Sequence, residues 1–381
     1  MTWIAYFAYY FLLLRFLVSL SNLFTRQWLA PSAACRYTNA SRQSLVSVLV
    51  PARNEENNIC NLLDDLSLQN YKNLEILVYD DLSEDDTGSQ VKNCIKKDNR
   101  IKLIEGKNLP AKWLGKNHAC HQLALNARGD YLVFVDADVR MKPGMIMNGL
   151  AHLERYNLDL LSVFPVQKMH TFAEKITVPV MNWILTGLLP LILTRKSSRH
   201  SLSAANGQFM LFRAETYHKH KFHAIHRNSF VEDIGIVRTM KKKRLPVHTV
   251  LSNGDISCRM YNSCKDAITG FSRSVTEYFG GHLSIAILFA AVTTLGFIPV
   301  FLVLPSFYQF TFGAMLILHR TVISALSRQP VLQNLFLAPL QQLSFIAMII
   351  SAIRHKLNYE LNWKGRNVYH TDIQTRSIIK T

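Results

Sequence analysis

Several features are absent from this sequence, and each absence argues against a class of protein. The six cysteines include no CxxC pair, so neither a disulfide framework nor a zinc ribbon is predicted. The histidines of HACH (118–121) and those at 218, 220, 223 and 226 match no zinc spacing. No basic stripe carries interleaved aromatic residues, so no nucleic-acid partner is expected.

The charge is nevertheless strongly positive, with a formal net value of +17 and an isoelectric point near 9.7. Without a nucleic-acid motif, anionic lipid and a diphosphate ligand explain this excess better. The basic run Lys241–Arg244 is interpreted as a solvated face near a bilayer, in preference to a specific phosphate site.

The chain begins with a long apolar run, from Trp3 to Phe24, which only Arg15 interrupts. This run is long enough to cross a hydrocarbon core of about 30 Å and lacks the basic start of a cleaved signal peptide. We therefore expect residues 1–25 to be an uncleaved transmembrane anchor, with Arg15 facing a partner helix or snorkelling in preference to a transport role. The following basic residues place the next part of the chain in the cytoplasm; they are Arg26, Arg36 and Arg42.

A second apolar region, residues 282–353, is predicted to be a C-terminal membrane region. His282–Leu304 and Val331–Ile353 each look able to span a membrane, whereas His319 and Arg320 weaken Phe307–Leu326. Residues 354–381 form a basic tail that favours the cytoplasm. We expect two full spans with an interfacial or re-entrant segment between them, and three spans remain an alternative. The protein is thus predicted to be a multi-pass cell-membrane protein whose catalytic domain is cytoplasmic.

From about Ser44 to Gly281, strand-like stretches alternate with helical ones. LVSVLVPARNEE, NLEILVYDDLSEDDT, RIKLIEG and YLVFVDADV each contain a strand, HACHQLALNAR indicates a helix, and a further helix is expected to begin near Glu55. This order predicts an α/β domain over 44–281 with a mostly parallel sheet covered on both faces. Within it, residues 178–194 are apolar but carry Pro179 and Pro190, and we interpret them as an interfacial or re-entrant segment, with a buried core helix as the alternative.

Acidic residues lie where the predicted strands end. In a parallel sheet, ligands bind beyond the carboxyl ends of the strands, where Glu55, Asp81, Asp136 and Asp138 are expected to meet. Such a group can hold Mg²⁺ or Mn²⁺ against a diphosphate and bind a nucleoside, which suits a nucleotide-sugar donor. The neighbouring Asp80, Asp85 and Asp86 are interpreted as turn and cap residues.

The ordered stretches VSVLVPARNEE, YDDLSEDDT, GKNHA, FVDADV, NGQFMLFRAETY and FVEDIG resemble those of family 2 glycosyltransferases of the GT-A fold. The resemblance implies a metal-dependent, inverting hexosyltransferase with a Rossmann-like domain. It also implies the site residues: Ala52, Glu55 and Asp81 at the uridine, Lys116 near the diphosphate, Asp136 and Asp138 as the DxD metal pair, Asp233 as the general base and Glu232 beside it.

A closer resemblance is to membrane-anchored bacterial enzymes that glycosylate polyisoprenoid lipids, the diaponeurosporenoate and hopanoid-associated glycosyltransferases. It rests on PARNEE, KWLGKNHAC, RMY (259–261) and WKGR (363–366). It implies transfer from a UDP-sugar, with UDP-glucose as first candidate, to a membrane lipid acceptor such as a carotenoid acid.

Several other functions remain open. The alternatives are a polyprenyl-phosphate glycosyltransferase and a processive polysaccharide synthase, although ISCRM lacks the glutamine and tryptophan of QxxRW. More remote are a haloacid-dehalogenase-type phosphatase, suggested by VFVDADV, and a non-enzymatic membrane scaffold.

Overall fold

The computed structural model describes residues 1–31, 44–261, 263–358, 362–363 and 366–367. Its contacts divide the chain into two compact units. The helical unit comprises Met1–Gln27, Val166–Ser197 and Arg259–Leu357, and the sheet unit comprises Trp28–Pro165, Ser198–Cys258 and Asn358–Thr381.

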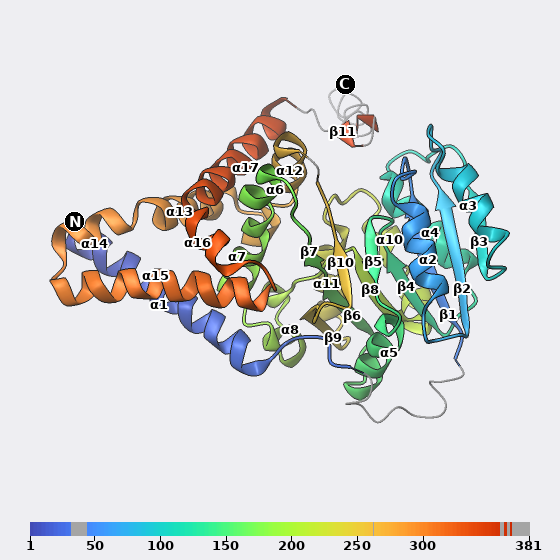
Figure 1. Cartoon of the computed structure of the whole chain (residues 1–381), viewed down its shortest axis with the longest axis horizontal. Helices are drawn as coiled ribbons and strands as arrows, with labels where there is room; N and C mark the ends of the chain where they lie inside the picture. The colour runs from blue at the N-terminus through green and yellow to red at the C-terminus, as the bar shows by residue number, and fades with distance from the viewer. Residues whose placement is uncertain (32–43, 262, 359–361, 364–365, 368–381) are drawn as a thin grey trace, which may run out of the picture. The chain divides into compact units, whose positions relative to one another are not determined.

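The sheet unit alternates strands with helices (Figure 1). Its strands are β1 (Val46–Ala52), β2 (Leu74–Asp80), β3 (Ile101–Glu105), β4 (Tyr131–Val135), β5 (Val139–Met141), β6 (Leu160–Phe164), β8 (Phe209–Arg213), β9 (Val247–Leu251), β10 (Ile256–Cys258), β11 (Asn362–Trp363) and β12 (Arg366–Asn367). Its helices are α2 (Ile59–Ser67), α3 (Thr87–Ile95), α4 (Gly115–Asn126), α5 (Met145–Arg155), η2 (His200–Leu202), α9 (Ala214–His220), α10 (Phe222–Ile225) and α11 (Glu232–Lys242).

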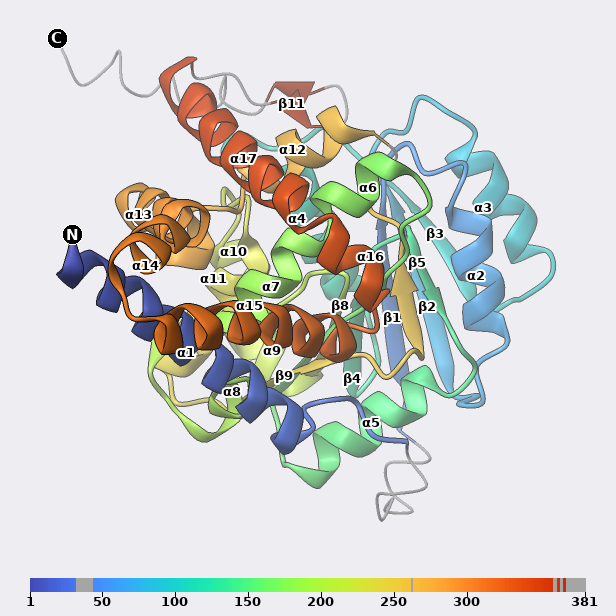
Figure 2. The ribbon, with the colours of Figure 1, turned by 60° about the vertical axis from the view of Figure 1, so that its left-hand side comes forward.

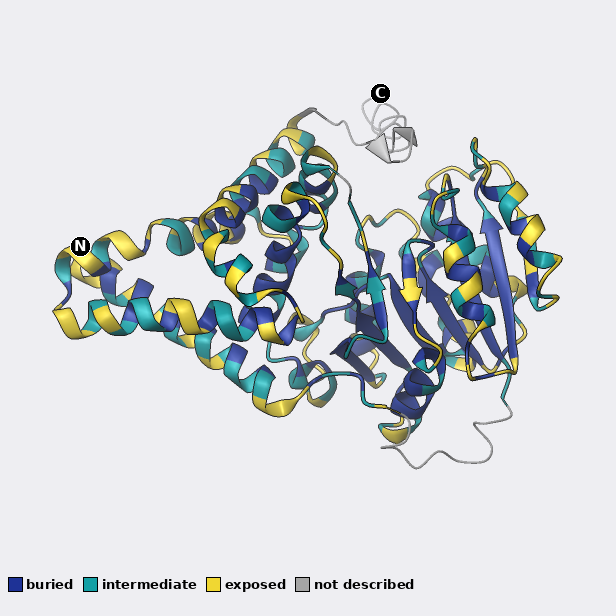
Figure 3. Cartoon of the chain, viewed as in Figure 1, coloured by how far each residue is buried: buried dark blue, intermediate teal, exposed yellow. Residues whose placement is uncertain are grey.

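Seven strands form one sheet in the order β3-β2-β1-β4-β8-β6-β9. Strand β8 runs antiparallel to β4 and β6, and the other neighbours are parallel. The predicted α/β fold with a mostly parallel sheet is therefore confirmed. Strands β1 and β2 are buried along nearly their whole length (Figure 3). Their sequences are therefore mostly apolar and do not alternate between apolar and polar residues.

The first helix of this unit begins later than expected. Asn54 adopts a left-handed conformation with φ 52°, and the amides of Asn58 and Ile59 both donate to the carbonyl of Glu55. Glu55 thus lies in a turn, and α2 begins at Ile59 and not near Glu55. This places Glu55 closer to the end of β1 than a helical position would.

Asp80 and Asp85 accept backbone hydrogen bonds in turns, as expected, whereas the side chain of Asp86 does not cap α3. Asp80 accepts a hydrogen bond from the amide of Ser83, and Asp85 accepts one from the amide of Glu56. Asp86 is the residue that precedes α3.

The basic run at the end of α11 is only partly solvated. Residues 242–244 are exposed, but the side chain of Lys241 is buried and donates to the carbonyl of Leu202 at 2.6 Å. Burial lowers the pKa of Lys241 to about 8. The interpretation of the whole run as a solvated face is therefore wrong for Lys241, because this side of the helix packs into the unit.

The helical unit contains most of the apolar helices (Figure 2). Its elements are α1 (Thr2–Thr25), β7 (Val166–Gln167), α6 (Phe172–Thr177), α7 (Pro179–Leu188), α8 (Ile192–Lys196), α12 (Cys264–Ser272), η3 (Glu277–Phe279), α13 (Leu283–Leu295), α14 (Phe297–Val303), α15 (Ser306–Leu326), α16 (Val331–Phe336) and α17 (Ala338–Asn358). Helix α1 packs against α7, α14 and α15.

Within the described residues, two helices are long and apolar enough to cross a membrane, α1 and α15. The bent pair Cys264–Phe279 with Leu283–Leu295 could form a third span. Our ranking of the C-terminal segments is wrong in this respect, since the middle segment is the continuous helix. The two flanking segments are broken, between α13 and α14 and between α16 and α17. Pro299 and Pro339 lie just after these breaks, where the ring clashes with the preceding turn and the amide donor is missing.

Residues 178–194 form two helices, α7 and α8, separated near Pro190. The side chain of Asn22, on α1, forms hydrogen bonds with the backbone at this break. Its side-chain amide donates to the carbonyls of Thr186 and Leu189, each at 2.9 Å, and its oxygen accepts from the amide of Leu191 at 2.7 Å. One buried side chain thus satisfies three backbone groups that the interrupted helix leaves free. The interfacial or re-entrant placement of this segment stays a prediction.

We expect Asn22→Leu to lower the thermal stability of the full-length protein. The substitution leaves the three backbone groups buried without partners, at about 1–3 kcal/mol each. Melting of the detergent-purified protein, followed by intrinsic fluorescence, measures the effect. Thr25→Leu, at an exposed position of the same helix, is the matched control; equal melting temperatures for the two variants would contradict this role.

Candidate functional site

The sheet topology brings several predicted site residues to one edge. Strands β2, β1 and β4 are adjacent and parallel, so Asp81, Ala52 and Asp136 follow or end neighbouring strands at their carboxyl ends. Strand β8 runs antiparallel to β4, with Phe209 opposite Val135, so the residues before β8 lie at this same edge. The N-terminus of α11 joins them through a hydrogen bond from the amide of Gly207 to Asp233.

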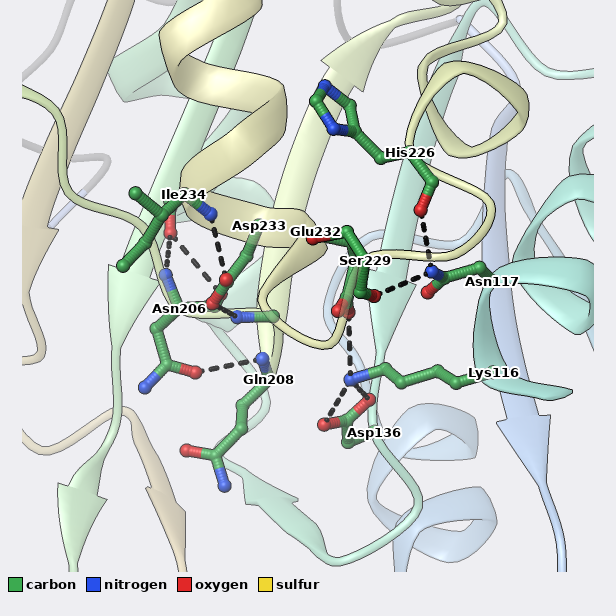
Figure 4. Close-up of polar contacts among 12 residues, drawn as sticks. Lys116, Asn117, Asp136, Asn206, Gln208, His226, Ser229, Glu232, Asp233 and Ile234 are labelled. Atoms are coloured by element: carbon green, nitrogen blue, oxygen red, sulfur yellow. Dashed lines mark hydrogen bonds and ion pairs between the residues drawn. The ribbon is translucent and has the colours of Figure 1, made fainter. Parts of the chain in front are cut away.

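Lys116, in the first turn of α4, connects two of the acids (Figure 4). Its Nζ lies 2.8 Å from Oδ1 and 2.9 Å from Oδ2 of Asp136, and 3.5 Å from Oε1 of Glu232. Burial by itself lowers the pKa of Lys116, but the two carboxylates raise it well above its ordinary value. The lysine is therefore an ammonium ion that neutralises the acids in the structure.

Asp138 lies in an environment that is unfavourable for a negative charge. Burial, together with the charges of Asp136 and Glu55, raises the pKa of Asp138 to about 7. Its Oδ1 is buried without a hydrogen-bond partner. The remaining contact is with the thiol of Cys258, which faces Val139 in the β5–β10 pair. A carboxylate oxygen held in this way can accept a cation.

Asp233 is held differently. Oδ2 accepts a hydrogen bond from the amide of Gly207 at 3.0 Å, and Oδ1 accepts one from the amide of Ile234 at 2.7 Å. Burial and the neighbouring Glu232 raise the pKa of Asp233 to about 7. A carboxyl group with such a pKa exchanges its proton near neutral pH, which suits a general base.

Ala52 and Asp81 form the part of the edge next to β4. The amide of Asp81 donates to the carbonyl of Ala52 at 2.8 Å, and Nη1 of Arg53 donates to the carbonyl of Asp81 at 2.6 Å. Asp81 is only 2% exposed. These contacts fix the backbone at the ends of β1 and β2, where the resemblance predicts a uridine.

The site also uses residues to which we assigned no role. Asn206 Oδ1 accepts from the amide of Gln208, and Asn117 Nδ2 donates to the carbonyls of His226 and Ser229 before α11 (Figure 4). A Cβ on Gly207 would lie 3.2 Å from Nζ of Lys116 and 3.4 Å from Oε1 of Glu232, so the absent side chain leaves room for the ion pair. These residues lie in the stretches GKNHA and NGQFM. Those stretches supported the resemblance to the family but gave no role to the individual residues.

The donor set fits a divalent cation that a substrate helps to hold. Among the described residues, no group of three or more His, Cys, Asp and Glu side chains could hold a metal ion by itself. Mg²⁺ is commonly bound by one or two carboxylates together with substrate phosphates. The unpartnered Oδ1 of Asp138 and the nearby Asp136 can supply such a pair. The metal site at Asp136 and Asp138 stays a prediction.

We expect Lys116→Met to strengthen binding of free Mn²⁺ by about tenfold, because the lysine ammonium competes for Asp136. The same variant should bind UDP more weakly, since a cation near the diphosphate is lost. Mn²⁺ electron paramagnetic resonance and equilibrium dialysis of UDP measure the two effects. Lys102→Met, at an exposed lysine of β3, is the control; unchanged Mn²⁺ affinity in Lys116→Met would exclude the competition.

Comparison with known proteins finds a family match within this chain. Residues 47–221 match the family described as Glycosyl transferase family 2. The chain is 26% identical over 231 residues to the 4,4'-diaponeurosporenoate glycosyltransferase of Staphylococcus haemolyticus, and 26% identical over 244 residues to that of Staphylococcus aureus strain MRSA252. These alignments cover 60% and 63% of this chain and 60% of each relative, so the chain spans about 60% of the length of the curated relatives.

Among solved structures, the mannosyltransferase PcManGT from Pyrobaculum calidifontis, in complex with GDP-Man and Mn²⁺, has a similar fold. It shares 17% sequence identity and a TM-score of 0.51, over 93% of this chain and 99% of its own. Residues 47–221 thus match the glycosyl transferase family 2 description, and the α/β fold is similar to that of this mannosyltransferase.

Proposed function

We propose that this protein is a metal-dependent, inverting glycosyltransferase that moves a hexose from a UDP-sugar to a membrane-embedded polyisoprenoid lipid. UDP-glucose is the first candidate donor, and a carotenoid acid is the first candidate acceptor. The observation that carries the proposal is the gathering of acids at one edge of the sheet, within the family match. Lys116 pairs with Asp136 and Glu232 and acts electrostatically on Asp138 and Asp233, and Glu55 acts on Asp138.

The assigned roles are those that the family resemblance implies, and the environments of these side chains support them. Asp136 and Asp138 would hold Mg²⁺ or Mn²⁺, which would supply positive charge to a departing diphosphate. Lys116 leaves Asp136 to approach the diphosphate, while Ala52, Glu55 and Asp81 contact the uridine. Asp233 accepts the proton of a hydroxyl acceptor, and Glu232 stays paired with Lys116.

The acceptor and the membrane location are supported by the helical unit and by the relatives. Helices α1 and α15 are long and apolar enough to cross a membrane. The two relatives named above are carotenoid glycosyltransferases by their names. We propose an N-terminal anchor over 1–25, a C-terminal membrane region over 282–353, and a glycosyltransferase domain over 44–281 that faces the cytoplasm, as does the tail 354–381. Lys356 lies in the last turn of α17, and residues 359–361, 364–365 and 368–381 lie outside the described residues.

The alternative functions can be distinguished from the proposed one by the family match and by one transfer assay. The family match covers Asp136 and Asp138, which supports a glycosyltransferase in preference to a haloacid-dehalogenase phosphatase. Membranes that contain the protein are incubated with radiolabelled UDP-glucose and Mn²⁺ or Mg²⁺, and lipids are extracted. We expect label in a carotenoid or hopanoid fraction. Label in a long polymer would indicate a processive synthase. Label in a polyprenyl phosphate would indicate a different acceptor, and no label above the Asp138→Asn background would indicate a scaffold.

The variant Asp138→Asn should bind Mn²⁺ far more weakly and lose metal-dependent turnover, because a neutral amide is a poor ligand for a hard cation. It should melt no lower than wild type, since it removes a buried charge that Asp136 and Glu55 repel. Paramagnetic resonance and thermal melting measure both effects. Asp86→Asn, at an exposed turn residue, is the control; normal turnover in Asp138→Asn would remove Asp138 from the site.

Asp233→Asn should distinguish the two kinds of acceptor. With a polyisoprenoid alcohol, we expect kcat to fall by about 10²–10⁴-fold, because the proton has no acceptor. The wild-type rate with this acceptor should fall as pH decreases through about 7, where Asp233 becomes protonated. With a carotenoid acid, which is already ionised, both effects should be small. Transfer rates for the two acceptors across pH provide the measurement, and equal losses with both would contradict the role of Asp233 as a base.

A further inference from the structure

The helical unit buries an arginine in the middle of its N-terminal helix. Arg15 is 6% exposed, and its guanidinium carbon lies 4.9 Å from the ring centroid of Phe289, 5.8 Å from that of Trp183 and 6.0 Å from that of Phe11. Its Nε is buried without a hydrogen-bond partner. The aromatic rings cover the cation but offer no lone pair to its N–H groups.

A second arginine contacts the same tryptophan. The guanidinium carbon of Arg320, on α15, lies 4.7 Å from the ring centroid of Trp183, and its Nη1 donates to Oε1 of Gln341 at 3.3 Å. The indole Nε1 of Trp183 is also buried without a partner. Two cations and one further N–H donor therefore gather around one ring.

No carboxylate of the described part of this unit neutralises the two arginines. The unit contains Glu174, Asp266 and Glu277 as its only acids within the described residues. Glu174 forms an ion pair with Arg259 at 2.8 Å, and Asp266 accepts hydrogen bonds from Ser263 at the start of α12. Neither Arg15 nor Arg320 forms an ion pair with any residue that the structure describes. Two buried like charges without an anion are unfavourable, because burial removes their hydration and they repel one another.

We propose that Arg15 and Arg320, together with Trp183, bind the oxyanion head group of a membrane amphiphile, a carboxylate or a phosphate. Guanidinium groups bind either oxyanion with paired N–H donors, and arginine is preferred over lysine for such sites in apolar surroundings. An ionisable side chain within a membrane segment is a functional-site candidate for the same reason.

The surroundings of the two arginines favour an amphiphile over a soluble anion. Arg15 and Arg320 lie on α1 and α15, the two helices that are long and apolar enough to cross a membrane. Large apolar side chains one helical turn from Arg320 are exposed, with Leu316 at 42% and Ile317 at 57%. These side chains can contact the hydrocarbon tail while the arginines hold the head group. This inference uses the proposed membrane location but not the transfer reaction.

The test compares the full-length protein in nanodiscs of phosphatidylcholine alone and of phosphatidylcholine doped with phosphatidylglycerol or with oleic acid. We expect either anionic amphiphile to raise the melting temperature of wild type and to bind at least about tenfold more tightly, by native mass spectrometry, than to Arg15→Met/Arg320→Met. Arg26→Gln, which removes an exposed charge at the end of α1, should keep the wild-type response. Equal responses of wild type and the double variant would overturn the proposal.

Two further measurements keep the outcome decisive. If the double methionine variant does not fold, Arg15→Lys/Arg320→Lys, which keeps both charges, replaces it. The wild-type series then decides the outcome by itself, because a melting temperature that does not depend on the anionic amphiphile overturns the site. Inorganic phosphate, added to wild type in phosphatidylcholine nanodiscs, should have little effect; stabilisation equal to that by phosphatidylglycerol would overturn the amphiphile and indicate a free anion. Preference for oleic acid over phosphatidylglycerol would identify a carboxylate as the head group.

None of these measurements contains a sugar donor. Loss of lipid labelling in the transfer assay with intact amphiphile binding would therefore contradict the proposed function and leave this site standing. Recovery of the protein in the soluble fraction of cells, in contrast, would contradict the membrane location on which this site rests.

Discussion

The ion pair between Lys116 and Asp136 is the interaction on which the organisation of the sheet edge depends. Several carboxyl groups approach one another there, and without a cation their repulsion and burial would oppose folding. Lys116 supplies one positive charge between Asp136 and Glu232. Asp138 forms no ion pair with Lys116, and burial together with the charges of Asp136 and Glu55 raises its pKa.

The same electrostatic reasoning applies with opposite sign in the helical unit. There the buried charges are the two arginines near Trp183, and the described residues provide rings and an amide in place of a carboxylate. In both units the protein buries charge of one sign without full compensation. Such arrangements are unfavourable for stability alone, and they are expected where a ligand of the opposite charge binds.

Much of the sheet unit could be predicted, because its strands are buried on both faces and their Val, Ile and Leu runs end at turn residues. The turn roles of Asp80 and Asp85 followed from the same pattern. The start of α2 could not be predicted as well, since the left-handed Asn54 and the hydrogen bond from the amide of Glu55 to Thr87 depend on a loop more than thirty residues away. Hydropathy also ranked the C-terminal segments incorrectly, because it counts apolar residues and does not register where Pro299 and Pro339 interrupt a helix.

The sequence alone determined which acidic and basic residues lie at the strand ends, and its short ordered stretches indicated a resemblance to a family. Only the tertiary structure decided how those charges are paired. Lys116 reaches Asp136 because α4 packs on β1 and β2, and Gly207 reaches Asp233 because β8 runs antiparallel to β4. Hydrogen bonds and ion pairs require separations of about 3 Å between residues distant in the chain. A one-dimensional pattern cannot supply such distances, since they arise from strand order and helix packing.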